Sequence, residues 1–141
     1  MATTRTATTH WQGSLMEGSG QVSLDSSGVG RYDVTWASRA EQPNGRTSPE
    51  ELIAAAHSAC FSMALSNALA KDGHAPESLR TQADVTFQPG TGITGVHLTV
   101  RATVPGLSGE QFQTYAEGAK EGCPVSKALA GTTITLDAAL A

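Results

Sequence analysis

The pattern of apolar and polar side chains divides the chain into one long apolar segment and several short alternating segments. Residues 52–70 carry no fixed charge, and their apolar side chains fall on almost every face of a helix. Ser48 as N-cap, Pro49 in the first turn and Glu51 as the acid of a capping box predict where this helix begins. Gly73 predicts where it ends. We therefore expect a central helix surrounded by protein.

Short segments of alternating polarity on both sides of this helix predict β-strands. Three precede the helix and three follow it: residues 10–15, 20–24, 31–36, 82–87, 96–104 and 134–138. Gly90 and Gly92 separate the fourth from the fifth and predict a long hairpin with one apolar face. Residues 37–47 contain Pro43 and Asn44-Gly45, which predict a loop.

Two further helices are expected near the C-terminus. Residues 108–121 have apolar side chains at helical spacing and the capping pair Ser108 and Gln111. A short helix over residues 124–129 starts at a proline, which leaves Cys123 at or next to its N-cap. The element order is therefore βββ-α-ββ-α-α-β, an α+β fold in which antiparallel strands cover helices.

Length and charge narrow the class of protein. A chain of 141 residues fits one domain over residues 1–141, with residues 1–8 as a flexible terminus. The net charge is −4 and the basic residues are scattered singly, so nucleic acid and anionic membranes are not expected partners. The N-terminal residues lack the apolar region of a secretory signal, and we expect a cytoplasmic protein.

The apolar helix is long enough to cross a membrane, but its composition favours a buried helix. About 20 apolar residues span a bilayer. Here His57, Ser62 and Asn67 would have to be satisfied in lipid, and alanines contribute little hydrophobicity. One small sheet covers only one side of such a helix, so a second copy of the chain is expected to cover the other in a two-fold dimer.

The two cysteines are the main candidates for chemistry. In a reducing compartment they are expected to be free thiols or a reactive pair rather than a structural crosslink. Cys60 lies in the middle of the apolar helix, where a cysteine is usually an inert packing residue. Cys123 is predicted at a helix start, where unpaired N–H groups and the helix dipole favour a thiolate.

Other chemistries find less support. His57 and Cys60 share one helix face and Cys123 could join them, but three ligands without a C-x-x-C or H-x-x-x-H pair do not favour a metal site. There is no G-x-S-x-G motif of a serine hydrolase, no phosphate-binding loop and no dinucleotide fingerprint. We therefore expect neither a metal nor a cofactor.

Two motifs carry a resemblance to a known family. SPEELIAAAHSACFSMALS, which starts at Ser48, and EGCPVSKAL, which contains Cys123, resemble the OsmC (osmotically inducible protein C) family of the OsmC/Ohr superfamily of thiol-dependent hydroperoxide reductases. The resemblance covers nearly the whole chain. Ser48 replaces the usual asparagine before Pro49-Glu50, which exchanges one good N-cap for another.

The resemblance implies an intertwined homodimer with two central helices wrapped by antiparallel sheets. It also implies a role for four residues. Cys60 would be the peroxidatic cysteine and Cys123 the resolving cysteine, which closes an intramolecular disulfide. Arg39 would stabilise the Cys60 thiolate, and Glu50 would hold the arginine.

The implied activity is a peroxidase that reduces organic hydroperoxides in oxidative or osmotic stress, with an external dithiol or a lipoylated protein as the reductant. The apolar neighbours Phe61 and Met63 favour an organic hydroperoxide over hydrogen peroxide alone. The alternative is a non-catalytic stress or ligand-binding dimer on the same fold, in which both cysteines are structural.

The spacing of Glu50 and Cys60 restricts how these residues meet. Ten residues on one straight helix separate their Cα atoms by about 15 Å along the axis, which one guanidinium cannot bridge. Either the helix is broken, or Arg39 and Glu50 act on Cys60 of the other subunit.

The apolar helix generates a first prediction. Because one small sheet cannot cover all of its faces, the folded protein should sediment as a dimer at micromolar concentration. A stable, folded monomer in the same sedimentation experiment would remove this expectation.

Overall fold

The computed structural model describes all 141 residues. The chain forms two compact units, Met1–Leu52 and Ile53–Ala141, and each is described here by itself. Helices and strands together confirm the predicted α+β class. The observed order is βββ-α-α-ββ-α-α-β, which contains one more short helix than the sequence pattern predicted.

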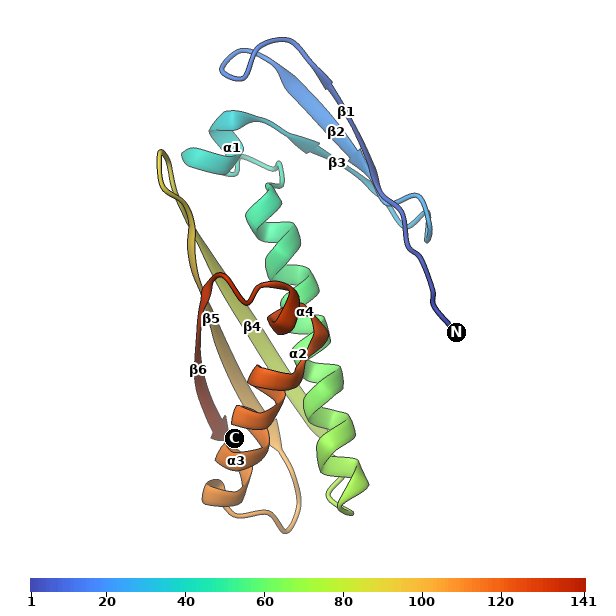
Figure 1. The fold of residues 1–141 in the computed structure, drawn as a ribbon, viewed down its shortest axis with the longest axis vertical. Coiled ribbons are helices and arrows are strands. Elements are labelled where there is room, and N and C mark those ends of the chain that lie inside the picture. Colours follow the sequence, from blue (N-terminus) through green and yellow to red (C-terminus); the bar gives the residue numbers. More distant parts are fainter. The chain divides into compact units, whose positions relative to one another are not determined.

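The N-terminal unit contains a three-stranded antiparallel sheet in the order β1-β2-β3 (Figure 1). Its strands are β1 (Thr8–Gln12), β2 (Ser19–Ser23) and β3 (Arg31–Val34). Gly20 pairs with Val34 across β2 and β3, and a Cβ at Gly20 would lie 2.7 Å from the Trp11 ring. The close approach of neighbouring side chains thus requires a glycine at the start of β2.

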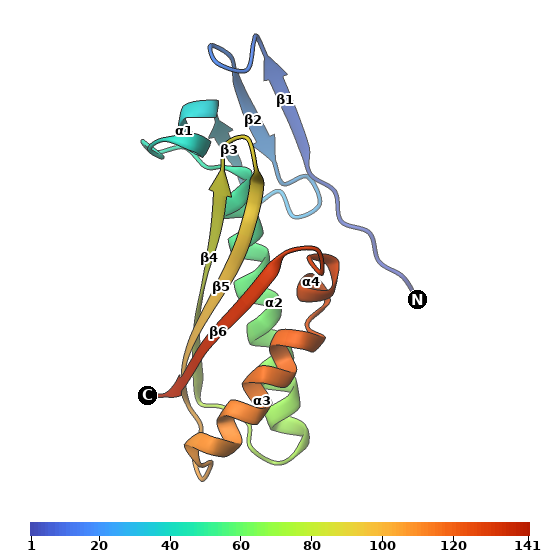
Figure 2. The same cartoon turned by 60° about the vertical axis from the view of Figure 1, so that its left-hand side comes forward.

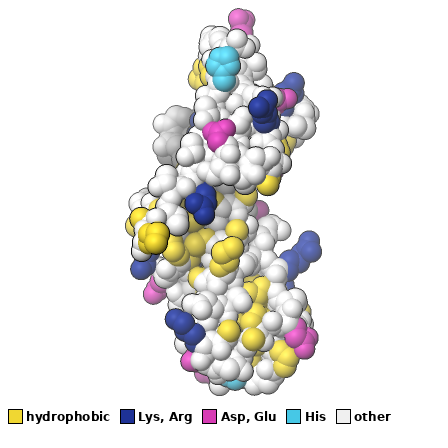
Figure 3. Space-filling model, turned by 90° about the vertical axis from the view of Figure 1, so that its right-hand side faces the viewer, with side chains coloured by type: hydrophobic (Ala, Val, Ile, Leu, Met, Phe, Trp, Pro, Cys, Tyr) yellow, Lys and Arg dark blue, Asp and Glu magenta, His cyan; other side chains and the backbone are white.

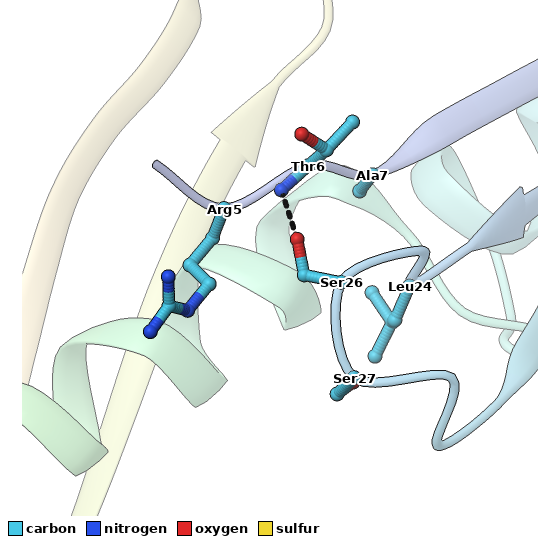
Figure 4. A pocket seen from close by; sticks show the side chains of 6 residues that line it. All are labelled: Arg5, Thr6, Ala7, Leu24, Ser26 and Ser27. Carbon is cyan, nitrogen blue, oxygen red and sulfur yellow. Dashed lines mark hydrogen bonds between the residues drawn. The ribbon is translucent and has the colours of Figure 1, made fainter. Parts of the chain in front are cut away.

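Within residues 1–8, the segment predicted to be a flexible terminus, Thr6 makes two hydrogen bonds to Ser26. The Ser26 N–H donates to the Thr6 carbonyl over 3.1 Å, and the Thr6 N–H donates to the Ser26 hydroxyl over 2.6 Å. Figure 4 shows this contact beside a pocket that Arg5, Leu24 and Ser27 help to line.

Helix α1 (Trp36–Ala40) occupies the place where the sequence predicted the end of a strand and a loop. The Thr35 side chain accepts from the Ser38 N–H, and the Ser38 side chain accepts from the Thr35 N–H. Such a capping box satisfies two N–H groups at a helix start, so the strand ends at Val34. The prediction was wrong here because the alternation through Trp36 hid this local signal. Arg39 therefore lies in a helix.

Helix α2 (Pro49–Lys71) starts where the sequence predicted, although its capping box is incomplete. The Ser48 hydroxyl oxygen accepts from the Glu51 N–H over 3.1 Å, as expected. The Glu51 carboxylate instead accepts from the Thr47 hydroxyl over 2.6 Å. The helix then continues without interruption to Lys71.

The C-terminal unit pairs three strands with helices α2, α3 and α4 (Figure 1, Figure 2). The strands are β4 (Ser78–Gln88), β5 (Gly92–Thr103) and β6 (Thr133–Leu140), in the order β4-β5-β6. The predicted hairpin is formed by β4 and β5. Strand β6 runs parallel to β5, so this sheet is mixed rather than wholly antiparallel. Helices α3 (Gly109–Gly122) and α4 (Pro124–Ala128) make the crossover that a parallel pair needs.

The core of this unit lies between the sheet and one face of α2 and α3. Phe61, Leu65 and Leu69 project from α2 at intervals of four residues and are fully buried. They pack with alternate residues of β5 and with one side of α3: Val96, Leu98, Val100, Phe112 and Ala116.

The opposite face of α2 is exposed in this chain. Met63 is 74% exposed, and Ala55, Ala59 and Asn67 lie on the same side of the helix and are exposed as well. Figure 3 shows apolar side chains gathered over this part of the unit. By length and composition α2 could also cross a membrane, but the core helix of a soluble protein passes the same test. The helix is apolar all round, while the chain itself covers only one face.

Candidate active site

Two cysteines distant in the sequence meet in the C-terminal unit. Cys60 lies in the middle of α2, and Cys123 is both the C-cap of α3 and the N-cap of α4. Their Sγ atoms are 2.9 Å apart, within reach of an S–H···S hydrogen bond, and both are free thiols. Cys123 is fully buried, whereas Cys60 is partly exposed. The structure thus confirms that Cys123 starts the short helix and brings it to Cys60.

The surroundings of the two sulfurs act on their pKa values in opposite directions. Burial raises the pKa of Cys60, and the hydrogen bond to Cys123 raises it further. Burial also acts to raise the pKa of Cys123, but hydrogen bonds from Cys60, Ser126 and Val125 outweigh it and lower that pKa. Within this unit Cys123 is the more acidic thiol.

His57 is the second titratable group at this site, one helical turn before Cys60. It is fully buried, and its Nε2 lies 2.7 Å from the Ser126 hydroxyl oxygen, while its Nδ1 has no hydrogen-bond partner. Burial lowers the pKa of His57, so the ring is neutral at neutral pH. On sequence alone, His57 was considered only as a possible metal ligand, and Ser126 was not identified as its partner. No local signal pointed to Ser126, because the two residues are 69 positions apart in the sequence.

A pocket of about 720 Å³ opens beside Cys60 between α2 and α3. The residues that line it are mostly small or apolar: Met63, Ala64, Asn67, Ala68, Thr114, Tyr115, Gly118, Ala119, Gly122 and Pro124. A Cβ at Gly118 or Gly122 would meet open space, so the lack of side chains there keeps the pocket wide. The pocket suits an apolar molecule with one end at the Cys60 sulfur.

Arg39 and Glu50 form an ion pair within the N-terminal unit. The Arg39 Nε and Nη2 atoms donate to the two carboxylate oxygens of Glu50 over 3.1 and 2.9 Å. Glu50 is buried in the first turn of α2, and Arg39 lies in the last turn of α1. This two-pronged contact fixes the plane of the guanidinium. The pair that the resemblance implied is present; its action on Cys60 stays a prediction.

Fold and site together define a two-cysteine α+β protein with an apolar pocket at one thiol. A model of the OsmC-like protein family matches residues 42–137. The chain is 43% identical over 131 residues to the Escherichia coli protein named peroxiredoxin OsmC, covering 91% of this chain and 90% of that one. The protein belongs to the OsmC-like family, as its motifs predicted.

More distant relatives share the fold. The chain is 32% identical over 99 residues to an organic hydroperoxide resistance protein of Xanthomonas axonopodis, covering 64% of this chain and 66% of that one. The crystal structure of the organic hydroperoxide resistance protein OhrB of Bacillus subtilis matches with a TM-score of 0.68 at 27% identity, over 96% of this chain and 98% of that one. A protein of the same description from Elizabethkingia anophelis matches over the full length of both chains, with a TM-score of 0.70 at 26% identity.

The Arg39–Glu50 pair generates a stability prediction. Arg39→Met leaves the buried Glu50 carboxylate without its cation, and we expect a loss of about 1–3 kcal/mol in the free energy of unfolding at pH 7. The lower part of that range allows for solvent screening, because the Arg39 side chain is 32% exposed. The double variant Arg39→Met/Glu50→Leu should recover part of the loss. Urea denaturation measures the free energy of unfolding of the wild-type protein and of both variants.

The exposed ion pair between Arg101 and Asp137 provides a matched control. Arg101→Met should change the free energy of unfolding by about 1 kcal/mol or less, because the side chains of both Arg101 and Asp137 face solvent. Equal effects of the two arginine substitutions would contradict a special role for the Arg39–Glu50 pair in holding the fold.

Proposed function

We propose that this protein is a cysteine-based peroxidase that reduces organic hydroperoxides to alcohols. The observation that carries the proposal is the contact of two free thiols, 2.9 Å apart, at an apolar pocket. The family relatives named peroxiredoxin and organic hydroperoxide resistance protein support it. The proposed setting is stress defence in the cytoplasm, where reductants keep both thiols free.

The proposed reaction has three steps. The Cys60 thiolate attacks the terminal oxygen of ROOH, the O–O bond breaks, and the leaving alkoxide takes a proton to give ROH and Cys60–SOH. The Cys123 thiolate then attacks the Cys60 sulfur, an S–S bond forms, and the departing hydroxide takes a proton to give water. An external dithiol reduces the disulfide and returns both thiols. No cofactor enters this sequence.

The first step requires a Cys60 thiolate, which the C-terminal unit does not favour by itself. Burial and the Cys123 contact raise the pKa of Cys60. A guanidinium beside the sulfur would reverse this order and donate to the leaving oxygen. We assign that role to Arg39, whose orientation is held by Glu50.

We further infer that the arginine acts across a dimer. Glu50 and Cys60 lie on one helix that the structure shows without a break, so the broken-helix alternative loses its support. On such a helix they are about 15 Å apart along the axis. The exposed apolar face of α2, which includes Met63, offers the surface on which a second copy would pack. The site would then combine Cys60 and Cys123 of one subunit with the partner subunit's Arg39 and Glu50.

Stoichiometric cumene hydroperoxide tests the proposed activity. We expect rapid loss of one thiol per chain, followed by one intramolecular disulfide, measured by thiol titration and mass spectrometry. Cys123→Ser should stop at the sulfenic acid, which an added dicarbonyl reagent traps. Cys60→Ser should leave Cys123 unreacted on the same timescale.

The non-catalytic alternative makes the opposite prediction. If both cysteines only pack, the hydroperoxide leaves two thiols per chain in the wild-type protein under the same conditions. That result would overturn the proposed peroxidase activity.

A further inference from the structure

The buried His57 occupies a position where an apolar side chain would be expected. It precedes Phe61, Leu65 and Leu69 on the same face of α2, and all four side chains are fully buried. An imidazole in such a place loses the hydration of two ring nitrogens, and here only one of them finds a partner. Packing alone therefore does not account for a histidine at this position.

The hydrogen-bond geometry indicates which ring nitrogen carries the proton. Nε2 lies 2.7 Å from the Ser126 hydroxyl oxygen, and Nδ1 has no partner. A buried N–H without a partner is rarer in proteins than a buried acceptor without one. The neutral ring thus carries its proton on Nε2 and donates it to Ser126.

The tautomer of His57 determines where the hydroxyl hydrogen of Ser126 points. A hydroxyl that accepts from His57 keeps its own hydrogen for another acceptor. Ser126 is the third residue after Cys123, in the short helix that Cys123 starts, and its hydroxyl is one of the groups that lower the pKa of Cys123. A chain of donors that ends on the sulfur follows from this assignment: His57 Nε2–H to Ser126 Oγ, and Ser126 O–H to Cys123 Sγ.

We propose that His57, acting through Ser126, is a positioning residue for the disulfide-forming step: it aims the Ser126 hydroxyl so that it stabilises the attacking Cys123 thiolate. This inference rests on the proposed function. The step is Cys60–SOH plus Cys123–SH giving the disulfide and water, in which the S–O bond of Cys60 breaks and the S–S bond forms. His57 and Ser126 begin and end the step in the same protonation state.

The size of the effect follows from two opposing trends. Losing a hydrogen bond to a charged group raises the pKa of Cys123 by about one to two units, which lowers its thiolate population about 10- to 100-fold below the pKa. A thiolate of higher pKa is a stronger nucleophile, and that gain recovers about half of the change on a logarithmic scale. Disulfide formation should therefore slow about three- to tenfold near neutral pH.

The charged and titratable groups near the Cys123 sulfur come from α2, α3 and α4. From α2 they are Cys60 and, through Ser126, His57. On α3, Lys120 and Glu117 form an ion pair with each other. Lys127 of α4 is exposed.

A thiolate titration tests the inference without any peroxide. In a Cys60→Ser background, the ultraviolet absorbance of the Cys123 thiolate is followed against pH. Ser126→Val should raise the pKa of Cys123 by about one to two units. Ser126→Thr should leave this pKa unchanged, because threonine has nearly the shape of valine but keeps the hydroxyl. His57→Leu should raise it in the same direction, because the hydroxyl loses its orientation. If valine is not accommodated, Ser126→Ala replaces it.

A single-turnover experiment with cumene hydroperoxide then measures both steps in one trace. In Ser126→Val and His57→Leu, the ratio of disulfide formation to Cys60 oxidation should fall about three- to tenfold at neutral pH. The difference should reverse at high pH, where every Cys123 is ionised and the less stabilised thiolate attacks faster. A merely structural role does not produce this reversal.

The exposed pair His97–Thr135, whose atoms are 2.6 Å apart, is the matched control, and His97→Leu should change neither the titration nor the ratio. Equal titrations of Ser126→Val and Ser126→Thr, or an unchanged pKa in His57→Leu, would overturn the proposal. Failure of Cys60 to react with the hydroperoxide would instead overturn the proposed function and leave the titration result standing.

Discussion

The contact between the Cys60 and Cys123 sulfurs is the interaction on which the account of this protein depends. At 2.9 Å the two thiols are in hydrogen-bond contact; burial and this contact raise the pKa of Cys60, whereas the contact and donors from α4 lower the pKa of Cys123. These directions suit the resolving role that we propose for Cys123. Burial in its own unit disfavours the Cys60 thiolate.

Local structure creates this difference between the two thiols. Cys123 ends α3 and starts α4, with Pro124 after it, and at this helix start the backbone N–H groups of Val125 and Ser126 act to lower its pKa. Cys60 lies in the middle of a 23-residue helix, away from either helix end, and the one group that acts to lower its pKa is the Val125 N–H of α4. The crossover from β5 to β6 brings the two positions together. The dipolar environment of each thiol thus follows from where its residue stands in a helix.

Much of the fold could be predicted from the sequence. The continuous apolar segment, the alternating hairpin and the Ser108 and Gln111 capping pair correctly predicted α2, β4–β5 and α3. Helix α1 was missed because its Thr35–Ser38 box stands inside a pattern that alternates like a strand. The parallel pairing of β6 was missed because periodicity does not report strand direction.

The candidate site was predictable only in part. Local reasoning identified Cys123 as a helix start, whereas the pairing of Arg39 with Glu50 and of Cys60 with Cys123 came from the family resemblance. The partnership of His57 with Ser126 joins residues 69 positions apart and had no signal of its own. Contacts between distant segments depend on how the elements pack, which a single sequence does not state.

Subunit mixing tests most directly the claim that Cys60 is activated by an arginine from the other subunit. Cys60→Ser and Arg39→Ala proteins are each inactive in this account, and they are unfolded together and refolded as an equal mixture. Half of the dimers then contain one subunit of each kind, with one complete site of two, so about a quarter of the wild-type activity should return. Heterodimers that form without any return of peroxidase activity would contradict the account.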